Sequence, residues 1–311
     1  MKVLIGIDNS PSSETLLDAV VNRVWPAQTR FCVLNIVNLQ RFERLPALIE
    51  DATREGRRLV QEGVKKLADA GYEAFAQTSP GHPRSDISCF AKEWGADLIL
   101  VGSHGHGAVG RFLLGSVAQG VLRTAPCSVE IVRTPSPSPS RRPMKVLLAT
   151  DGSEFSLAAA RVIASQPWPP DTIFKVLSVQ ELVIVGNQME AASLSAIYPA
   201  TLLEELTTQS EGQAKSAIET ARDILRGAGL MLHDGDPMPL GEPRAVILDT
   251  AKNWGADLIV VGSHGRRGLD RFLLGSVTEA IAVHAPCSVR VVRAPQQTKK
   301  DRHSTAGNSV R

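Results

Sequence analysis

Residues 94–117 read WGADLILVGSHGHGAVGRFLLGSV, and residues 254–277 read WGADLIVVGSHGRRGLDRFLLGSV. The two stretches are identical at 18 of 24 positions and lie 160 residues apart. In each copy an apolar run leads into a loop with glycines at fixed places and ends at a Gly-Ser pair. A period of this length is too long for a solenoid repeat, so it indicates a duplicated whole domain.

The duplication extends to both ends of each half. Residues 2–10 (KVLIGIDNS) match residues 145–153 (KVLLATDGS) at an offset of 143, and the sequence APCSV occurs at 125–129 and again at 285–289. Because the offset grows from 143 to 160, the second half carries about 17 extra residues. We place them within residues 182–206, where the matching part of the first half is short.

Two domains follow from this arrangement, and the length of 311 residues suits two domains of roughly 150 residues each. We assign residues 1–134 to the first domain and residues 144–294 to the second. The Pro- and Ser-rich residues 135–143 between them favour an extended linker. Residues 295–311 are polar, lack apolar periodicity and are predicted to be a disordered tail.

Within each domain, short apolar runs alternate with segments of helical periodicity. This alternation predicts a parallel sheet with helices on both faces, whose ligands lie beyond the carboxyl ends of the strands. The predicted strands cover residues 3–7, 31–37, 72–78, 97–101 and 128–133, then 146–150, 174–179, 258–261 and 288–292. The predicted helices cover residues 15–24, 52–68, 84–94 and 116–124, then 214–225, 245–254 and 276–283.

Composition excludes several classes of protein. Hydrophobic residues make up 43% and charged residues 21%, which is globular composition, and the formal net charge of +2 gives no footprint for nucleic acid. No apolar run reaches the roughly 18 residues of a membrane span. The four cysteines form no CxxC pair, so we expect reduced thiols and a cytoplasmic protein.

The glycine loop is the segment that carries chemistry. It runs Gly-Ser-His-Gly, nine residues, then Gly-Ser, starting at Gly102 in the first half and at Gly262 in the second. The Gly-Ser pair stands where a helix is predicted to begin, so free backbone N–H groups and the positive end of the helix dipole would face an incoming phosphate.

Other interpretations of this loop stay open. Residues 110–116 (GRFLLGS) lack the lysine of a Walker P-loop, and the GxGxxG match in residues 105–110 has no counterpart in the second half. The patterns Ser116-x-x-Gln119 and Ser276-x-x-Glu279 predict capping boxes, which would satisfy the helix ends without any ligand. Capping and phosphate binding are not mutually exclusive.

The pattern G-x2-G-x9-G-(S/T), placed after an apolar strand and combined with the opening Asp-Gly-Ser of residues 151–153, resembles the universal stress protein family. The resemblance covers nearly the whole chain twice, as in tandem-type members. It implies two Rossmann-like domains of the adenine nucleotide alpha hydrolase-like kind, each a five-stranded parallel sheet of order 3-2-1-4-5. It also implies the ATP-binding subgroup, with or without Mg²⁺.

The family's site residues carry over position by position. Asp8 and Asp151 match a carboxylate near the adenine, and Ile36 and Val179 match an apolar contact to the base or sugar. The phosphate and ribose loop corresponds to Gly102, Ser103, His104, Gly105, Gly115, Ser116 and Val117 in the first half, and to Gly262, Ser263, His264, Gly265, Gly275, Ser276 and Val277 in the second. Asn9 replaces the usual glycine after the first aspartate, and we expect little effect because Asn tolerates left-handed backbone.

Two of these residue types have other possible roles. His104 and His264 lack companions at metal-ligand spacing, so we expect them to stabilise the loop or lie beside phosphate, and we predict no metal site and no catalytic residue. Arg111 and Arg271 can be read equally as phosphate contacts or as surface ion pairs.

The resulting hypothesis is an ATP-binding, nucleotide-dependent regulator or sensor of the stress response with at most weak ATP hydrolysis. The alternatives are an enzyme of adenylyl or phosphoryl transfer and a scaffold with vestigial sites. The expected partners are an adenine nucleotide and a possible second copy of the chain, but neither nucleic acid nor membrane. We also predict that residues 129–132 pair with residues 289–292, because both would otherwise be exposed sheet edges.

Overall fold

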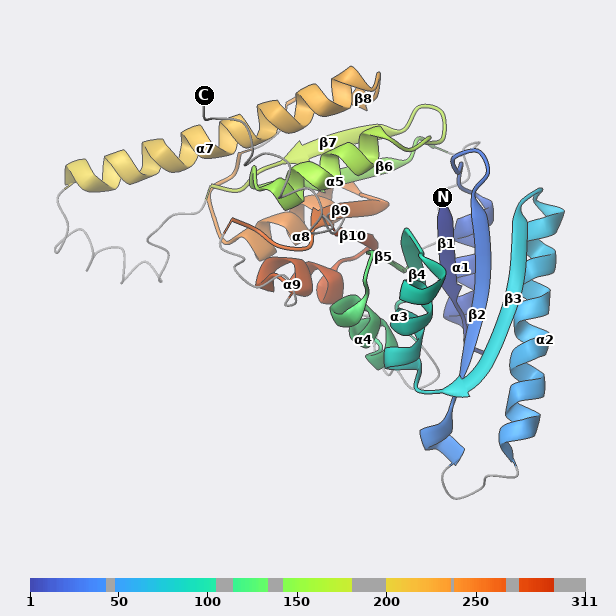
Figure 1. Cartoon of the computed structure of the whole chain (residues 1–311). Helices are drawn as coiled ribbons and strands as arrows, with labels where there is room; N and C mark the ends of the chain where they lie inside the picture. Colours follow the sequence, from blue (N-terminus) through green and yellow to red (C-terminus); the bar gives the residue numbers. More distant parts are fainter. Residues whose placement is uncertain are drawn as a thin grey trace, which may run out of the picture.

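A computed structural model describes residues 1–42, 48–104, 114–133, 142–180, 200–235, 238–266 and 274–293 (Figure 1). Each half repeats the same strand–helix order. The first half contains β1 (Lys2–Gly6), α1 (Pro11–Val21), β2 (Arg30–Asn38), the short 3₁₀ helix η1 (Leu39–Phe42), α2 (Leu48–Asp69), β3 (Glu73–Gly81), α3 (Pro83–Trp94), β4 (Leu98–Gly102), α4 (Ser116–Thr124) and β5 (Ser128–Val132). The second contains β6 (Lys145–Ala149), α5 (Glu154–Ala164), β7 (Ile173–Leu177), α7 (Ala200–Gly227), β8 (Met231–Leu232), α8 (Pro243–Trp254), β9 (Leu258–Gly262), α9 (Ser276–His284) and β10 (Ser288–Val292).

The described strands form one ten-stranded sheet of order β3-β2-β1-β4-β5-β10-β9-β6-β7-β8. Within each half the strands are parallel and follow the order 3-2-1-4-5, which confirms the predicted fold. The two halves meet where β5 and β10 run antiparallel, with Glu130 opposite Arg290. These are the strands for which the sequence predicted pairing.

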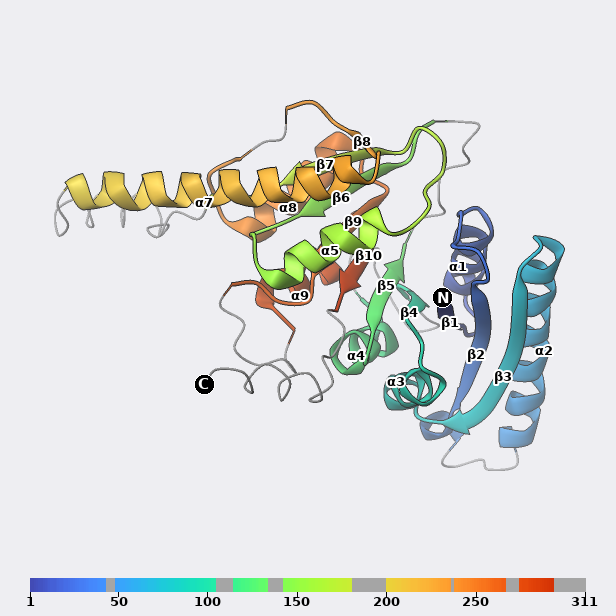
Figure 2. The same ribbon diagram turned by 45° about the horizontal axis from the view of Figure 1, so that its top comes forward.

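Helix α7 differs most from expectation. It has 28 residues and begins at Ala200, whereas periodicity predicted a helix only over residues 214–225. Its N-terminal part projects beyond the sheet (Figures 1 and 2), and most of its described side chains over residues 201–213 are exposed. Residues 181–199, which hold most of the predicted extra segment, lie outside the described residues.

The second half also contains elements for which the sequence analysis gave no range, namely α5 and the two-residue strand β8. Strand β7 ends at Leu177, so Val179 lies beyond the strand that was predicted to contain it.

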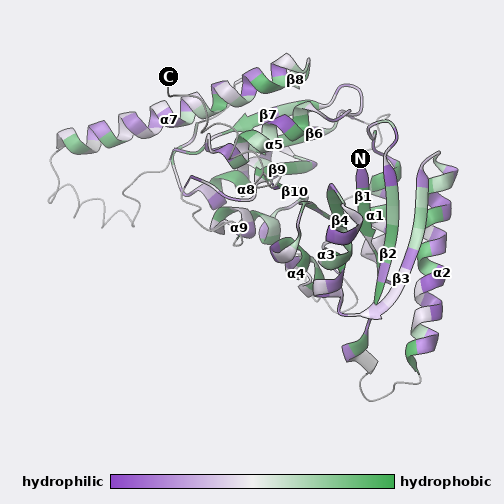
Figure 3. Cartoon of the chain, in the orientation of Figure 1, coloured by the Kyte–Doolittle hydropathy of each residue, from purple (hydrophilic) through white to green (hydrophobic). Residues whose placement is uncertain are grey.

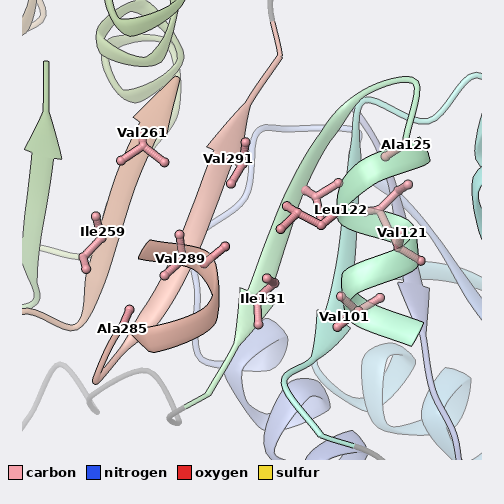
Figure 4. Close-up of a cluster of buried hydrophobic side chains, with 14 of the residues drawn as sticks. Val101, Val121, Leu122, Ala125, Ile131, Ile259, Val261, Ala285, Val289 and Val291 are labelled. Atoms are coloured by element: carbon pink, nitrogen blue, oxygen red, sulfur yellow. The ribbon is translucent and has the colours of Figure 1, made fainter. Parts of the chain in front are cut away.

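The buried apolar side chains form three clusters, and their arrangement shows how the halves are joined. On the sheet face covered by α3, α4, α8 and α9, one core is continuous across the junction. Figure 4 shows Val121 and Ile131 of the first half in the same cluster as Val289 and Val291 of the second. On the opposite face, α1 and α2 cover one separate core and α5 and α7 another.

Hydropathy follows this layering, because apolar residues concentrate along the strands between the helices (Figure 3). Among the described helices, none combines the length and the apolar character that crossing a membrane requires.

Candidate functional site

A cavity of about 610 Å³ lies at the carboxyl ends of the second half's central strands. Strands β6 and β9 are neighbours there, and their chain connections leave in opposite directions, which is the switch point where ligands of such sheets bind. Eight of the nine predicted residues of this half line the cavity: Asp151, Val179, Gly262, His264, Gly265, Gly275, Ser276 and Val277. The ninth, Ser263, is not among the lining residues.

Asp151 follows β6 and holds the glycine loop against the strand end. Its Oδ1 accepts a hydrogen bond from the Ser153 amide at 3.0 Å, and its Oδ2 accepts one from the Arg266 amide at 2.9 Å. Burial raises the pKa of Asp151, but hydrogen bonds from Ser153, Ser156 and the Arg266 amide outweigh it and hold the pKa below its ordinary value. The carboxylate therefore stays charged at neutral pH, beside the cavity.

The glycine spacing that both halves share is explained in this half by close approach of other atoms to the glycines, and not by left-handed backbone. None of Gly262, Gly265 and Gly275 has a positive φ. A Cβ on Gly262 would lie 2.7 Å from the carbonyl carbon of Phe155, at the start of α5. A Cβ on Gly265 would lie 2.8 Å from Asp151 Oδ2. Gly262 therefore allows α5 to pack closely on the end of β9, and Gly265 allows the loop to approach the Asp151 carboxylate.

The N-terminus of α9 opens onto the cavity without a side-chain cap. The N-cap residue is Gly275 and not Ser276, so the predicted capping box is wrong: no hydroxyl stands at the N-cap, and the serine is the first helical residue. The first intrahelical hydrogen bond runs from the Glu279 amide to the Gly275 carbonyl at 2.9 Å. The amides of the preceding turn thus have no acceptor within the helix, and residues 276–278 line the cavity.

His264 presents a buried polar atom at the same place. The residue is 5% exposed, and its Nδ1 lies 3.0 Å from Ser263 Oγ. Its ring packs on that of Phe155 at a centroid distance of 5.0 Å. In the described part of the chain, its Nε2 has no hydrogen-bond partner. Ser263, 2% exposed, therefore positions the imidazole from beneath the cavity, and the imidazole is left with one unsatisfied nitrogen at the wall.

Helix α7 supplies a wall that sequence reasoning missed. Four of its residues line the cavity: Leu206, Gln209, Ser210 and Gln213. Gln213 Oε1 accepts a hydrogen bond from the Arg266 guanidinium, which links this helix to the glycine loop. Only Leu206 fell within the predicted extra segment. The remaining three lie between this segment and the helix predicted over residues 214–225, where the two halves show no matching sequence.

Further lining residues lie next to predicted ones. Thr150 precedes Asp151, and Ile247 of α8 and Ile281 of α9 form the apolar floor. Thr278 Oγ1 donates to the Gly262 carbonyl at 2.8 Å, which fastens the first turn of α9 to the end of β9.

The first half repeats part of this arrangement. The Gly115 amide donates to the Ser103 carbonyl at 2.8 Å, and Ser103 Oγ lies 2.9 Å from His104 Nδ1. The N-cap of α4 is again a glycine, Gly115, so the capping box predicted at Ser116 is also wrong. Like its counterpart, His104 Nε2 is buried and has no hydrogen-bond partner within the described ranges.

The remaining predicted residues of the first half are placed as follows. Ile36 lies inside β2, 9% exposed, and Val117 follows Ser116 in the first turn of α4. Gly102 ends β4, where a Cβ would lie 2.9 Å from Ser12 Cβ. Gly105 lies outside the described residues.

The turn after the first strand differs between the halves. Gly152 has a φ of +78°, whereas Asn9 is not in the left-handed region, so the expectation that it substitutes conformationally for glycine is wrong. With the altered turn, Asp8 Oδ1 accepts hydrogen bonds from the hydroxyls of Ser10 and, at 3.0 Å, Ser13. The first aspartate thus accepts hydrogen bonds at its own helix start, and Asp151 accepts one from its loop; residues 105–113 of the first loop lie outside the described residues.

Comparison with known proteins agrees with this geometry. The sequence pattern of the Universal stress protein family matches residues 1–133 and again residues 143–293. The chain belongs to the universal stress protein family. Its two matches make it a tandem member, in which two family domains share one chain.

Two sequence relatives illustrate the similarity. A universal stress protein of Mycolicibacterium smegmatis is 26% identical over 299 residues, covering 94% of this chain and 96% of the relative. A universal stress protein of Methanocaldococcus jannaschii is 32% identical over 154 residues, covering 49% of this chain and 84% of the relative. The first shows that the tandem arrangement recurs along nearly the full length of another family member.

Solved structures support the fold. The crystal structure of a universal stress protein from Archaeoglobus fulgidus superposes with a TM-score of 0.65 at 20% identity, covering 94% of this chain and 98% of that chain. At this level of identity the likeness concerns the fold alone.

Proposed function

We propose that this universal stress protein binds ATP at the carboxyl ends of its strands and acts as a nucleotide-dependent regulator of the stress response. The observation that carries the proposal is the cavity of the second half. It combines an uncapped helix N-terminus, a buried imidazole nitrogen that has no partner among the described residues, and apolar lining in about 610 Å³. This volume lies within the roughly 300–1,000 Å³ of small-ligand sites.

Each part of the cavity suits a different part of the nucleotide. The bare amides at the start of α9 and the positive end of its dipole favour phosphate oxygens. The Arg266 guanidinium, held by Gln213, adds a positive charge at the edge of the loop. Val179 and Ile247 offer apolar surface for a purine or ribose, and Asp151 offers acceptor oxygens for an amino group.

His264 contributes through its unsatisfied nitrogen. With Nδ1 accepting from the Ser263 hydroxyl, Nε2 carries the proton and donates to an anionic oxygen; in the other tautomer Nε2 accepts. Either state gains a partner when a polar ligand enters, which removes the cost of a buried polar atom left unpaired.

The first half offers the same uncapped helix at Gly115 and the same orphan nitrogen on His104, so we extend the proposal to a site in that half. All four cysteines are free thiols, which suits a reducing compartment, and we propose a cytoplasmic location on that ground.

The test is a ligand series on the full-length chain. Purified protein is first denatured and any released small molecule is identified by mass; stripped protein is then titrated calorimetrically with ATP, ADP, AMP and adenosine. We expect affinity to fall by at least tenfold from ATP to adenosine, because the amides and Arg266 act on phosphate. Equal affinity for adenosine would refute the phosphate assignment, and absence of binding to every member would refute the proposal.

The same samples separate a regulator from an enzyme. We expect bound ATP to persist without turnover approaching the enzyme median of about 10 per second. Hydrolysis at such a rate would show that the protein is an ATPase and would contradict the proposed regulatory role.

A further inference from the structure

The junction between the halves contains a buried ionic cluster on its pseudo-twofold axis. Glu130 of β5 and Arg290 of β10 occupy the same position in the two repeats, within SVEIV and SVRVV. They are also directly opposite each other in the antiparallel register. A twofold axis relating the halves therefore passes between them, and in a junction of two identical halves either residue would meet its own copy.

The two side chains are buried and in contact. Glu130 is 0% exposed and Arg290 is 3% exposed. The Arg290 guanidinium donates from Nε to Glu130 Oε2 at 2.8 Å, and its Nη2 lies 2.8 Å from the same oxygen. Both side chains project from the sheet face opposite to the continuous core, between the two separate cores of that face.

A second pair of equivalent residues completes the cluster. Arg23 and Gln166 each follow the first helix of their half and correspond at the repeat offset of 143. Arg23 Nη2 lies 2.5 Å from Glu130 Oε1, and Gln166 Oε1 accepts from Arg290 Nη1. The quartet thus consists of Arg and Glu from the first half and Gln and Arg from the second.

A second set of polar contacts at the junction is reciprocal: each half makes the same contact to the other half. Arg133 Nη2 donates to the Ala282 and Val283 carbonyls at the end of α9, and Arg293 Nη2 donates to the equivalent carbonyls at the end of α4. The amides of these two arginines donate to Ser288 and Ser128 in the same reciprocal way. Because these residues are shared by both repeats, their contacts would form in any pairing and cannot select a partner.

Within the described ranges, one other polar contact joins unlike residues across the junction, the ion pair between Arg123 and Glu279 at 2.5 Å. The Arg123 side chain is 59% exposed, so solvent screens this pair and it contributes little to selection. Selection therefore falls on the buried quartet.

Like-half pairings would be mismatched at the quartet. Two second halves would bury two Arg290 guanidiniums beside Gln166 and the Trp168 ring, with no carboxylate from the quartet to balance them. Two first halves would keep two Arg23–Glu130 pairs, so their charges balance, but the two Glu130 carboxylates would lie directly opposite each other without the Arg290 guanidinium. Two second halves are therefore disfavoured by buried charge without compensation. Two first halves are disfavoured by like charges placed opposite each other across paired strands.

We propose that the quartet of Arg23, Glu130, Gln166 and Arg290 determines which domains share the central junction, so that a first-half domain accepts a second-half domain and rejects another first-half domain. The partner that this surface fits is thus the unlike half of the same chain. The linker brings that half close, and the quartet supplies the discrimination.

The first test exchanges the quartet across the axis in the full-length chain. In the fourfold variant R23Q/E130R/Q166R/R290E each side chain moves to the position of its counterpart, so every contact is restored with the halves exchanged. We expect its melting temperature to lie within about 2 °C of the wild-type value. The single changes E130R and R290E should each lower it by about 6–10 °C, the effect of breaking a buried pair in a chain of this size. An exchanged chain as unstable as the single variants would overturn the proposal.

Should the single variants not fold, E130Q and R290Q replace them. The proposal then requires the double variant to lose less in melting temperature than the two single losses combined, because R290Q removes one of the two guanidiniums that E130Q leaves without a carboxylate. Additive losses would contradict it.

The second test measures partner choice directly. A protease site is placed within residues 134–143 of the folded full-length chain, and the cut halves of differently tagged samples are mixed and weighed by native mass spectrometry. Wild-type halves should form complexes of unlike halves alone. Mixing cut wild-type with cut fourfold variant should yield a new complex of two first halves. The wild-type first half carries Arg at position 23 and Glu at position 130, and the variant first half carries Gln and Arg at these positions, so the four side chains of the quartet are all present. Like-half complexes in the wild-type sample, or their absence from the mixture, would overturn the proposal.

Discussion

A glutamate in place of Ser276 should stabilise the protein and abolish ligand binding in the second half. Ser276 is the first residue of α9, is exposed and lines the cavity. A carboxylate in the first turn of a helix interacts favourably with the helix dipole, by about 0.3–1 kcal/mol. The same carboxylate would stand where we place the phosphates, so stability and binding should change in opposite directions.

The size of the binding effect follows from the geometry of an exposed helix end. For two unit charges roughly 5 Å apart, an effective dielectric constant between about 20 and 80 gives a repulsion of about 1–3 kcal/mol. That corresponds to a loss of about 5- to 150-fold in affinity for each phosphate charge nearby. With a polyphosphate, the second-half site should fall below detection at micromolar ligand.

The assay pairs calorimetric titration with ATP and thermal unfolding of the ligand-free protein. S276E should lose one equivalent of bound ATP while its melting temperature stays equal or rises by up to about 2 °C. The isosteric but neutral S276Q is the control for bulk, and S116E, the matched change in the first half, should remove the other equivalent. ATP affinity within twofold of wild type in S276E would refute the phosphate assignment at this helix.

Three further outcomes are expected. G262A should cost about 2–3 kcal/mol of stability by chemical denaturation, because its Cβ would meet the Phe155 backbone, whereas the matched G102A, which meets a side chain, should cost about 1 kcal/mol; equal costs would contradict this. Burial raises the pKa of Glu130, but Arg23 and Arg290 lower it to about 2, so its contribution of about 3 kcal/mol is complete above pH 4.5 and is lost as pH falls towards 2. The melting temperature of wild type should therefore fall more steeply over that interval than that of E130Q, and parallel curves would be inconsistent with a paired Glu130. Finally, a thiol reagent should modify only Cys89 in the native protein, because Cys89 is exposed and burial raises the pKa of the other three cysteines to about 12. Rapid modification of a second thiol, or the same number of modified thiols in C89S as in wild type, would contradict this.

The sheet was predictable because its signals are local and occur twice. Short apolar strands such as residues 98–101, followed by glycines and helical periodicity, define a βα unit in each half, and the paired edges followed from apolar strands that would otherwise be exposed. Helix α7 was underestimated for the opposite reason. Its first turns project beyond the sheet, so no burial pattern marks them.

Eight of the residues predicted from the second half line one cavity, but the sequence assigned some of their structural roles wrongly. Ser276 matched a capping box because the pattern does not reveal which residue leaves the helical conformation first, and the structure shows that Gly275 does. Gly262 recurs in the pattern because α5 packs on it, a contact between segments that are distant in sequence. Gln213 could not be found at all, since its role depends on how α7 crosses the cavity.

The two halves have kept identity where the backbone demands it and have diverged where unlike partners are an advantage. Ser103 and Ser263 make the same contacts in each half: the carbonyl accepts from the glycine amide before the helix, and the hydroxyl lies beside the following histidine. On the pseudo-twofold axis the constraint is different. In a dimer of identical chains a residue on the axis must meet itself, so a charge there is repelled by its own copy. Fusion of the halves into one chain removes that constraint, and Glu130 opposite Arg290 is a pairing that only unlike halves can have.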